Sequence, residues 1–137
     1  MNQANILQKI KIANFLDDRG QISVAELINV DNFIVRRIYY ISQVVGNQKR
    51  GLHAHKKLNQ IFFSISGSFK LSVTDGSIYD SYDLKQHGSG VFLPSGYWRE
   101  LSDFSPGAIC LVLASEHFLQ SDYIYDFDEY LKWKNNA

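Results

Sequence analysis

The chain is poor in several features that mark specialised classes of protein. Its 137 residues include one cysteine, Cys110, and two prolines, and 14 basic residues balance 14 acidic ones. A single cysteine cannot form an internal disulfide, so nothing indicates an oxidising compartment. The zero net charge argues against nucleic acid or an anionic membrane surface as a partner. No apolar run approaches the roughly 20 residues of a membrane helix, and residues 1–6 lack a signal-peptide core, so we expect a cytoplasmic protein.

What the chain does contain is a series of short apolar segments, rich in aromatic residues and separated by turn signals. The length fits one domain over residues 1–137, and no repeat or linker divides it. Strands about ten residues apart, with no helix between them, predict an all-β sandwich or barrel. The predicted strands are 9–15, 21–27, 35–45, 60–65, 69–74, 77–83, 90–93 and 108–114, with Asp75-Gly76 as a two-residue hairpin turn.

The C-terminal tail has a different pattern. Ser121 and Asp122 resemble a helix cap, and apolar residues then recur at helical spacing, with acids early and lysines late. We therefore expect a short C-terminal helix that covers one end of the barrel. Its apolar positions are Tyr123, Ile124, Phe127, Tyr130 and Leu131.

The most informative local feature is the pair His53 and His55. Residues two apart in a strand point to the same face, so both imidazoles project into one side of the sheet. Such a pair can bind a metal, move protons or simply form hydrogen bonds as buried polar groups. Arg50 precedes the pair; its guanidinium suits phosphate oxygens, although a solvated charge at a strand end is an equally common role.

The intervals around this pair resemble the two motifs of the cupin family. His53, His55, Gln60 and Gly67 follow the spacing of the first motif, and the second aligns with Gly88, Pro94, Gly96, Arg99 and Asp103. The resemblance implies a cupin-type jelly-roll β-barrel. In metal-binding cupins the two histidines, a glutamate and a later histidine hold the metal, but here Gln60 and Arg99 take the last two places. A guanidinium repels a cation and an amide is a weak ligand, so we expect no metal.

A longer set of segments, of which Arg50-Gly51-Leu52-His53-Ala54-His55-Lys56 is the most specific, resembles the nucleotide-sugar 3,4-ketoisomerases. The resemblance implies an enzyme that moves the ketone of dTDP-4-keto-6-deoxyglucose from C-4 to C-3 through an enediol, without metal or cofactor. It also implies that His53 and His55 are catalytic. We expect His55 to move the carbon-bound proton and His53 to serve the oxygen atoms, with the reverse order left open.

Several other residues are candidates for substrate contacts. Arg50 suits the diphosphate, and Arg99, which faces inward by the alignment, should meet a substrate oxygen or an internal acid. The other candidates are Gln60, Arg19, Tyr39 and Trp98. For the aromatic residues among them, packing in the core of the barrel is the commoner role. The family resemblance and the apolar segment 60–65 favour a homodimer. The alternatives are a dTDP-sugar 3,5-epimerase-like enzyme and a non-catalytic barrel that binds sugar nucleotides.

Overall fold

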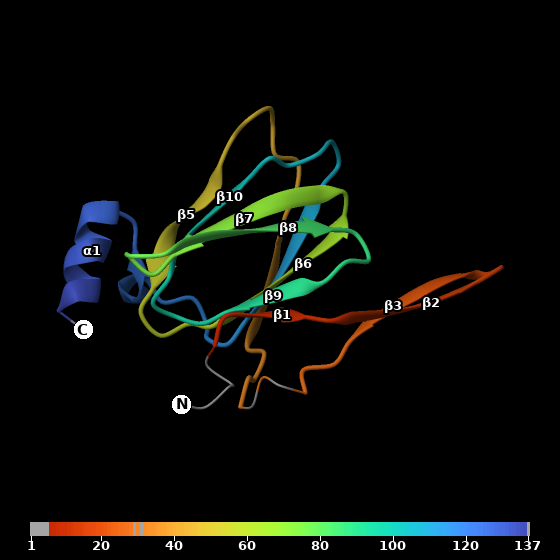
Figure 1. Ribbon diagram of the computed structural model, residues 1–137, viewed down its shortest axis with the longest axis horizontal. Helices are drawn as coiled ribbons and strands as arrows, with labels where there is room; N and C mark the ends of the chain where they lie inside the picture. The colour runs from red at the N-terminus through yellow and green to blue at the C-terminus, as the bar shows by residue number, and fades with distance from the viewer. Residues whose placement is uncertain (1–5, 29, 31, 137) are drawn as a thin grey trace.

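The computed structural model describes residues 6–28, 30 and 32–136. The signal-peptide prediction rests mainly on residues 1–5 and therefore lies outside the described residues. Two five-stranded antiparallel sheets face each other, and a separate hairpin projects from them (Figure 1). In spatial order the first sheet contains β1 (Gln8–Ile10), β9 (Gly90–Leu93), β6 (Gln60–Ser66), β11 (Ile109–Ala114) and β4 (Arg37–Ile41). The second contains β12 (Tyr123–Ile124), β5 (Arg50–His55), β10 (Trp98–Ser102), β7 (Ser68–Thr74) and β8 (Tyr79–Lys85).

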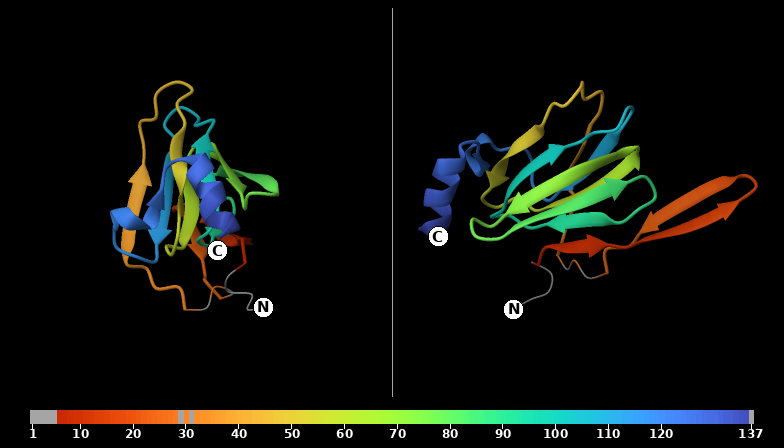
Figure 2. Two further views of the ribbon diagram at one scale, coloured as in Figure 1. Left: turned by 90° about the vertical axis from the view of Figure 1, so that its left-hand side faces the viewer. Right: turned by 45° about the horizontal axis from the view of Figure 1, so that its top comes forward.

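The predicted all-β jelly roll with a short C-terminal helix is confirmed. Among the described residues no hydrogen-bonded ladder joins the two sheets, so they form a sandwich rather than a closed barrel. The hairpin, β2 (Ile12–Asp17) and β3 (Gly20–Ala25), projects at one end, and helix α1 (Phe127–Asn135) lies at the other (Figure 1). In the left view of Figure 2, α1 stands in front of the two layers. No helix in the described part of the chain is long and apolar enough to span a bilayer.

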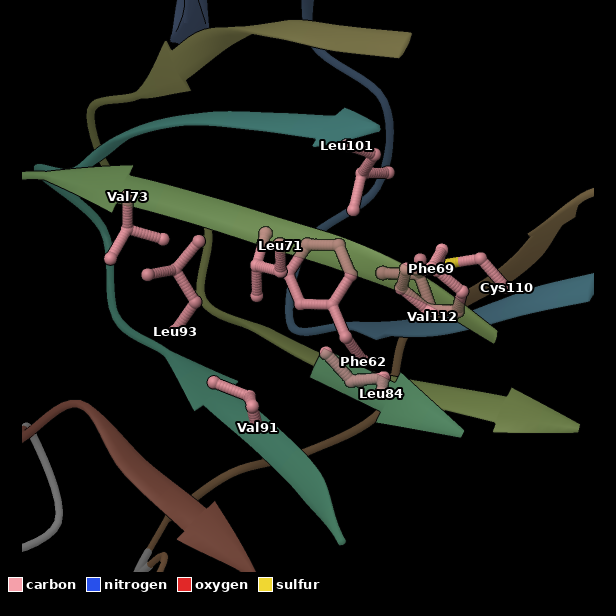
Figure 3. Close-up of a cluster of buried hydrophobic side chains, with 10 residues drawn as sticks. All are labelled: Phe62, Phe69, Leu71, Val73, Leu84, Val91, Leu93, Leu101, Cys110 and Val112. Atoms are coloured by element: carbon pink, nitrogen blue, oxygen red, sulfur yellow. The ribbon is translucent and has the colours of Figure 1, made fainter. Parts of the chain in front are cut away.

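The main core fills one part of the space between the sheets. Alternate residues of each strand face inward and meet there, as the period of a β-strand requires. Figure 3 shows these side chains, from strands β6 to β11, packed against one another. They are Phe62, Phe69, Leu71, Val73, Leu84, Val91, Leu93, Leu101, Cys110 and Val112.

The helix begins later than the sequence predicted. Residues 120–122 form a short 3-10 turn, Tyr123 and Ile124 pair with β5, and α1 starts after Asp126, whose side chain accepts a hydrogen bond from the Glu129 amide. The predicted cap was wrong because the Asp122 side chain is engaged elsewhere: it accepts from the amide of Lys57. The packing of α1 on one end of the sheets is as expected: Tyr130 is buried against Ala54 and Ile124.

Strand boundaries also differ from the predicted ones. The segment 9–15 is divided between β1 and β2, which pair with different partners. The segment 35–45 contributes only β4, and Gln43, with a φ of 57°, leaves the extended conformation soon after it. The connection after Thr74 has four residues instead of two, because the Asp75 carboxylate accepts from the amides of both Ser77 and Ile78. The strands β10 and β12 had no predicted counterpart.

Candidate active site

The polar part of the space between the sheets is centred on β5. His53 and His55 point inward from the same face of this strand, and their rings meet edge to face at 4.8 Å between centroids. Their Nε2 atoms are 3.1 Å apart. His55 is buried and His53 is half-buried, so the pair lies just inside the mouth of the sandwich.

Arg99 enters this site from β10, directly opposite His53 in the sheet register. Its side chain is 2% exposed, and Nη2 lies 2.8 Å from His53 Nε2. Nη2 also donates to the Tyr39 hydroxyl and Nη1 to the Gly51 carbonyl, but Nε has no partner among the described residues. We predicted that Arg99 meets either a substrate oxygen or an internal acid. No acid among the described residues forms an ion pair with Arg99, so the second possibility is wrong for this part of the chain.

Gly51 makes room for this guanidinium. Its φ of 68° lies in the left-handed region, and a Cβ built there would collide with Nη1 of Arg99. A side chain at this position would therefore strain the backbone and force the Arg99 guanidinium to move.

The opposite sheet contributes Tyr39 from β4 and Gln60 from β6. Gln60 Nε2 donates to the Tyr39 hydroxyl at 2.8 Å, and Arg99 donates to the same oxygen at 3.2 Å. Because this oxygen accepts two hydrogen bonds, its own proton remains available to a further acceptor. Burial raises the pKa of Tyr39, which keeps the hydroxyl protonated.

Asp122 stands behind His55 and was assigned only a capping role from the sequence. Its side chain is buried, and Oδ2 lies 3.0 Å from His55 Nδ1. Oδ1 accepts from the Lys57 amide at 2.7 Å. The residue was missed because 67 positions separate it from His55, so no local pattern joins them.

Arg37 and a group of aromatic rings form the wall beside the histidines. Arg37 lies two residues before Tyr39 on the same face of β4, a spacing that could have marked it in the sequence. It donates to the Tyr123 hydroxyl at 3.3 Å. The Tyr123 ring lies 4.9 Å from that of His53 and 4.3 Å from that of His55. The site thus holds one buried cationic side chain, Arg99, and one half-buried one, Arg37, near two imidazoles.

The surroundings keep both imidazoles neutral. Burial, and then the charge of Arg99, lower the pKa of His53 from 6.5 to about 2. Burial and the same cation lower that of His55 to about 3. Neutral imidazoles have a free lone pair and can accept a proton from carbon or oxygen. The nearby thiol of Cys110 is of no use for this chemistry, because burial raises its pKa to about 12.

The same residues do not fit a metal ion. At the two cupin ligand positions Gln60 donates its amide to Tyr39, and Arg99 places a fixed positive charge 2.8 Å from His53 Nε2. A divalent cation at the imidazoles would meet that charge at close range. The described residues also contain no cluster of three or more His, Cys, Asp or Glu suited to a metal.

The structure places three predicted site residues away from the histidine pair. Arg50 is exposed at the start of β5. Trp98 points to the outer face of the second sheet, where it contacts Phe127 and lines a groove of about 860 Å³ that contains neither histidine. Arg19 lies at the tip of the projecting hairpin, 86% exposed and paired with Asp17 (Figure 1).

Comparison with known proteins agrees with this geometry. A family model described as FdtA, WxcM-like, C-terminal, matches residues 5–135. A TDP-4-oxo-6-deoxy-α-D-glucose-3,4-oxoisomerase of Aneurinibacillus thermoaerophilus is 34% identical over 126 residues, 90% of this chain and 91% of that protein. The solved structure of a 3,4-ketoisomerase from Helicobacter canadensis matches this chain with a TM-score of 0.86 and 35% sequence identity. The match covers 94% of this chain and 97% of that one.

A further solved structure holds a sugar nucleotide. It is a histidine-to-asparagine mutant of QdtA, the 3,4-ketoisomerase of Thermoanaerobacterium thermosaccharolyticum, in complex with TDP-4-keto-6-deoxyglucose. Its TM-score is 0.87 at 30% identity, covering 96% of this chain and 95% of that one. The family match over nearly the whole chain and these likenesses in sequence and fold establish that the chain belongs to the FdtA family of WxcM-like proteins.

Proposed function

We propose that the protein is a TDP-sugar 3,4-ketoisomerase that converts TDP-4-keto-6-deoxyglucose to a TDP-3-keto-6-deoxyhexose, with residues 1–137 as one catalytic domain. The observation that carries the proposal is the pair of neutral imidazoles with Nε2 atoms 3.1 Å apart beside a buried arginine. The activities named for the relatives, a 3,4-oxoisomerase and two 3,4-ketoisomerases, support the same reaction.

The two histidines take different parts in this reaction. His55, backed by Asp122, removes the C-3 proton, which the C-4 ketone acidifies; the electron pair of the broken C–H bond forms the double bond of an enediolate. The 3-hydroxyl gives up its proton, the oxygen of C-4 gains one, and C-4 is protonated to leave a ketone at C-3. His53 accepts from Arg99 at Nε2, so its Nδ1–H is available to donate to a sugar oxygen.

Arg99, Tyr39 and Gln60 stabilise the enediolate. The buried guanidinium of Arg99 and the Tyr39 phenol, whose proton has no acceptor among the described residues, are held together before the charge develops. Donors fixed in a site that excludes water stabilise a developing oxyanion strongly, and removing one typically costs about 10²–10³ in kcat. Arg50 and Arg37 are the cations we assign to the diphosphate.

We also infer a homodimer in which Arg19 serves the site of the second copy. The hairpin projects away from strand β5, which carries His53, so we infer that Arg19 reaches a sugar nucleotide only across an interface (Figure 1). The hairpin exposes Phe15 and Ile22, and edge strand β4 exposes Ile38 and Tyr40, which leaves apolar side chains on both elements for a partner to cover.

The oligomer is tested by light scattering of the eluted protein. Ile38→Lys should shift the mass from dimer to monomer, whereas Ile78→Lys, equally exposed on the β7–β8 turn, should leave it unchanged. A monomeric wild-type protein would overturn the dimer and the role of Arg19 with it.

The reaction is tested by incubation with TDP-4-keto-6-deoxyglucose in heavy water, followed by proton spectra. We expect a C-3 ketone and deuterium at C-4 once the mixture reaches equilibrium. Exchange at C-3 and C-5 with the ketone still at C-4 would instead identify an epimerase. A protein that binds the nucleotide but neither moves the ketone nor exchanges a proton would be a non-catalytic barrel.

A further inference from the structure

The protonation of His53 is set by Arg99. A guanidinium has only N–H donors, so His53 Nε2, 2.8 Å from Arg99 Nη2, must be the acceptor. A neutral imidazole carries one proton, and that of His53 therefore lies on Nδ1. The lone pair on Nε2 faces the interior of the site.

The protonation of His55 is set by Asp122 in the same way. The backbone amide of Lys57 can only donate, and its 2.7 Å bond fixes Oδ1 of Asp122 as an acceptor. The weaker bond from the Leu58 amide at 3.4 Å falls on Oδ2. A carboxylate held by two backbone donors accepts the third hydrogen bond, from His55 Nδ1, at 3.0 Å. Neutral His55 thus also carries its lone pair on Nε2.

The two lone pairs consequently converge. The Nε2 atoms are 3.1 Å apart, a distance suited to a hydrogen bond, yet the two flanking partners leave no hydrogen between them. One added proton converts this repulsive contact into an N–H···N hydrogen bond and places the imidazolium next to the Asp122 carboxylate. Burial and the Arg99 charge keep the pair neutral at rest, but a proton delivered from carbon would be held at this point by both nitrogen atoms.

We propose that Asp122 is a positioning residue that, together with Arg99, opposes the two Nε2 lone pairs, so that the histidine pair acts as a single base for the carbon-bound proton. The proposal rests on the 3,4-ketoisomerase function. The proton from C-3 binds the Nε2 lone pair of His55, and His53 Nε2 then shares its lone pair between this new N–H and the N–H of Arg99 Nη2. The proton is released when a C–H bond forms at C-4, so the pair ends the cycle neutral and unchanged.

Asp122→Asn separates this role from a purely structural one. The Lys57 amide requires the Asn oxygen at the Oδ1 position, so the Asn NH₂ faces His55 Nδ1 and donates to it. His55 then carries its proton on Nε2, where the lone pair is lost. The matched control is Asp75→Asn, because the Asp75 carboxylate also accepts two backbone amides but belongs to the β7–β8 turn.

The tautomers are measured by two-dimensional spectra of the ¹⁵N-labelled imidazoles in protein without substrate. We expect a protonated Nδ1 and an unprotonated Nε2 for His55 in wild type, the reverse in Asp122→Asn, and no change in Asp75→Asn. We further expect kcat of Asp122→Asn to fall about 10³–10⁴-fold, by comparison with the same replacement in a Ser-His-Asp triad, with KM changed less than about threefold.

Two outcomes would overturn the proposal: an unprotonated Nδ1 on wild-type His55, or wild-type turnover by a variant whose tautomer has inverted. The wild-type spectrum decides the first even if Asp122→Asn fails to fold. Because the spectra need no substrate, a wild-type protein with the expected tautomers but no turnover would refute the proposed function instead.

Discussion

The space between the two sheets has an apolar part and a polar part, and the same strands supply both. Strand β6 contributes Phe62 to the core and Gln60 to the site, and β10 contributes Leu101 and Arg99. In the apolar part only shape and volume matter, because the side chains make no directional contacts. In the polar part each group is held by specific partners, and two guanidinium Nε–H groups, those of Arg37 and Arg99, have none in the described structure. One part of the interior stabilises the fold, while the other holds the polar groups of the candidate site.

The largest expected effect on the polar part is that of His55→Ala. Loss of the carbon-directed base should lower kcat by about 10³–10⁴, because general acid–base catalysis is worth up to that factor. Turnover of the 4-keto sugar nucleotide gives kcat, and TDP binding is measured separately by titration calorimetry. Binding should be largely kept, and a fully active variant would remove His55 from the mechanism.

The matching change in the apolar part is Leu71→Ala. Leu71 is fully buried, and its truncation should lower the free energy of unfolding by about 3 kcal/mol through lost burial and a residual cavity. Activity per folded molecule should stay near wild type at a temperature where the variant remains native. The free energy of unfolding is measured by urea titration with tryptophan fluorescence as the signal. A large loss of kcat without a loss of stability would contradict the division of the interior into an apolar and a polar part.

Arg99→Met should move activity and stability in opposite directions. The variant loses the stabilisation of the enediolate, so kcat should fall about 10²-fold. It also removes a buried cation that has no acidic partner, so the free energy of unfolding should rise by about 1 kcal/mol. Parallel urea titrations and turnover assays test both parts, and a variant less stable than wild type would show that Arg99 contributes to the fold.

The smallest effect is a shift in the pH profile. Because the pKa of His53 is lowered to about 2 and that of His55 to about 3, wild-type kcat/KM should show no loss of base on acidification from about pH 8 to about pH 5. Removing the Arg99 cation raises the pKa of His53 toward 6.5, so in Arg99→Met kcat/KM should begin to fall at a higher pH. A wild-type profile that falls near 6.5 would mean that the imidazoles are not shielded from protonation.

Local spacing was enough to predict much of this arrangement. Strand periodicity predicted that His53 and His55 share a face, and the cupin-like intervals aligned Gln60 and Arg99 with the other two ligand positions. The structure shows that both of these side chains donate to Tyr39. Asp122 could not be found in this way, because it reaches His55 only through the fold. The next residues, Tyr123 and Ile124, also follow the helical pattern of the tail, although their pairing with β5 holds them as a strand. Tertiary contacts therefore overrode a local preference at the place where the site needed a carboxylate.

Gly51 limits the order in which this site can change. Any side chain at position 51 collides with the Arg99 guanidinium, so a larger residue there becomes sterically possible only after Arg99 has been shortened. Even then its φ of 68° penalises every residue except glycine. Variation at position 99 can thus proceed one substitution at a time, whereas variation at position 51 cannot. A mutagenesis library is therefore expected to tolerate larger residues at position 51 mainly in members that carry a short residue at position 99.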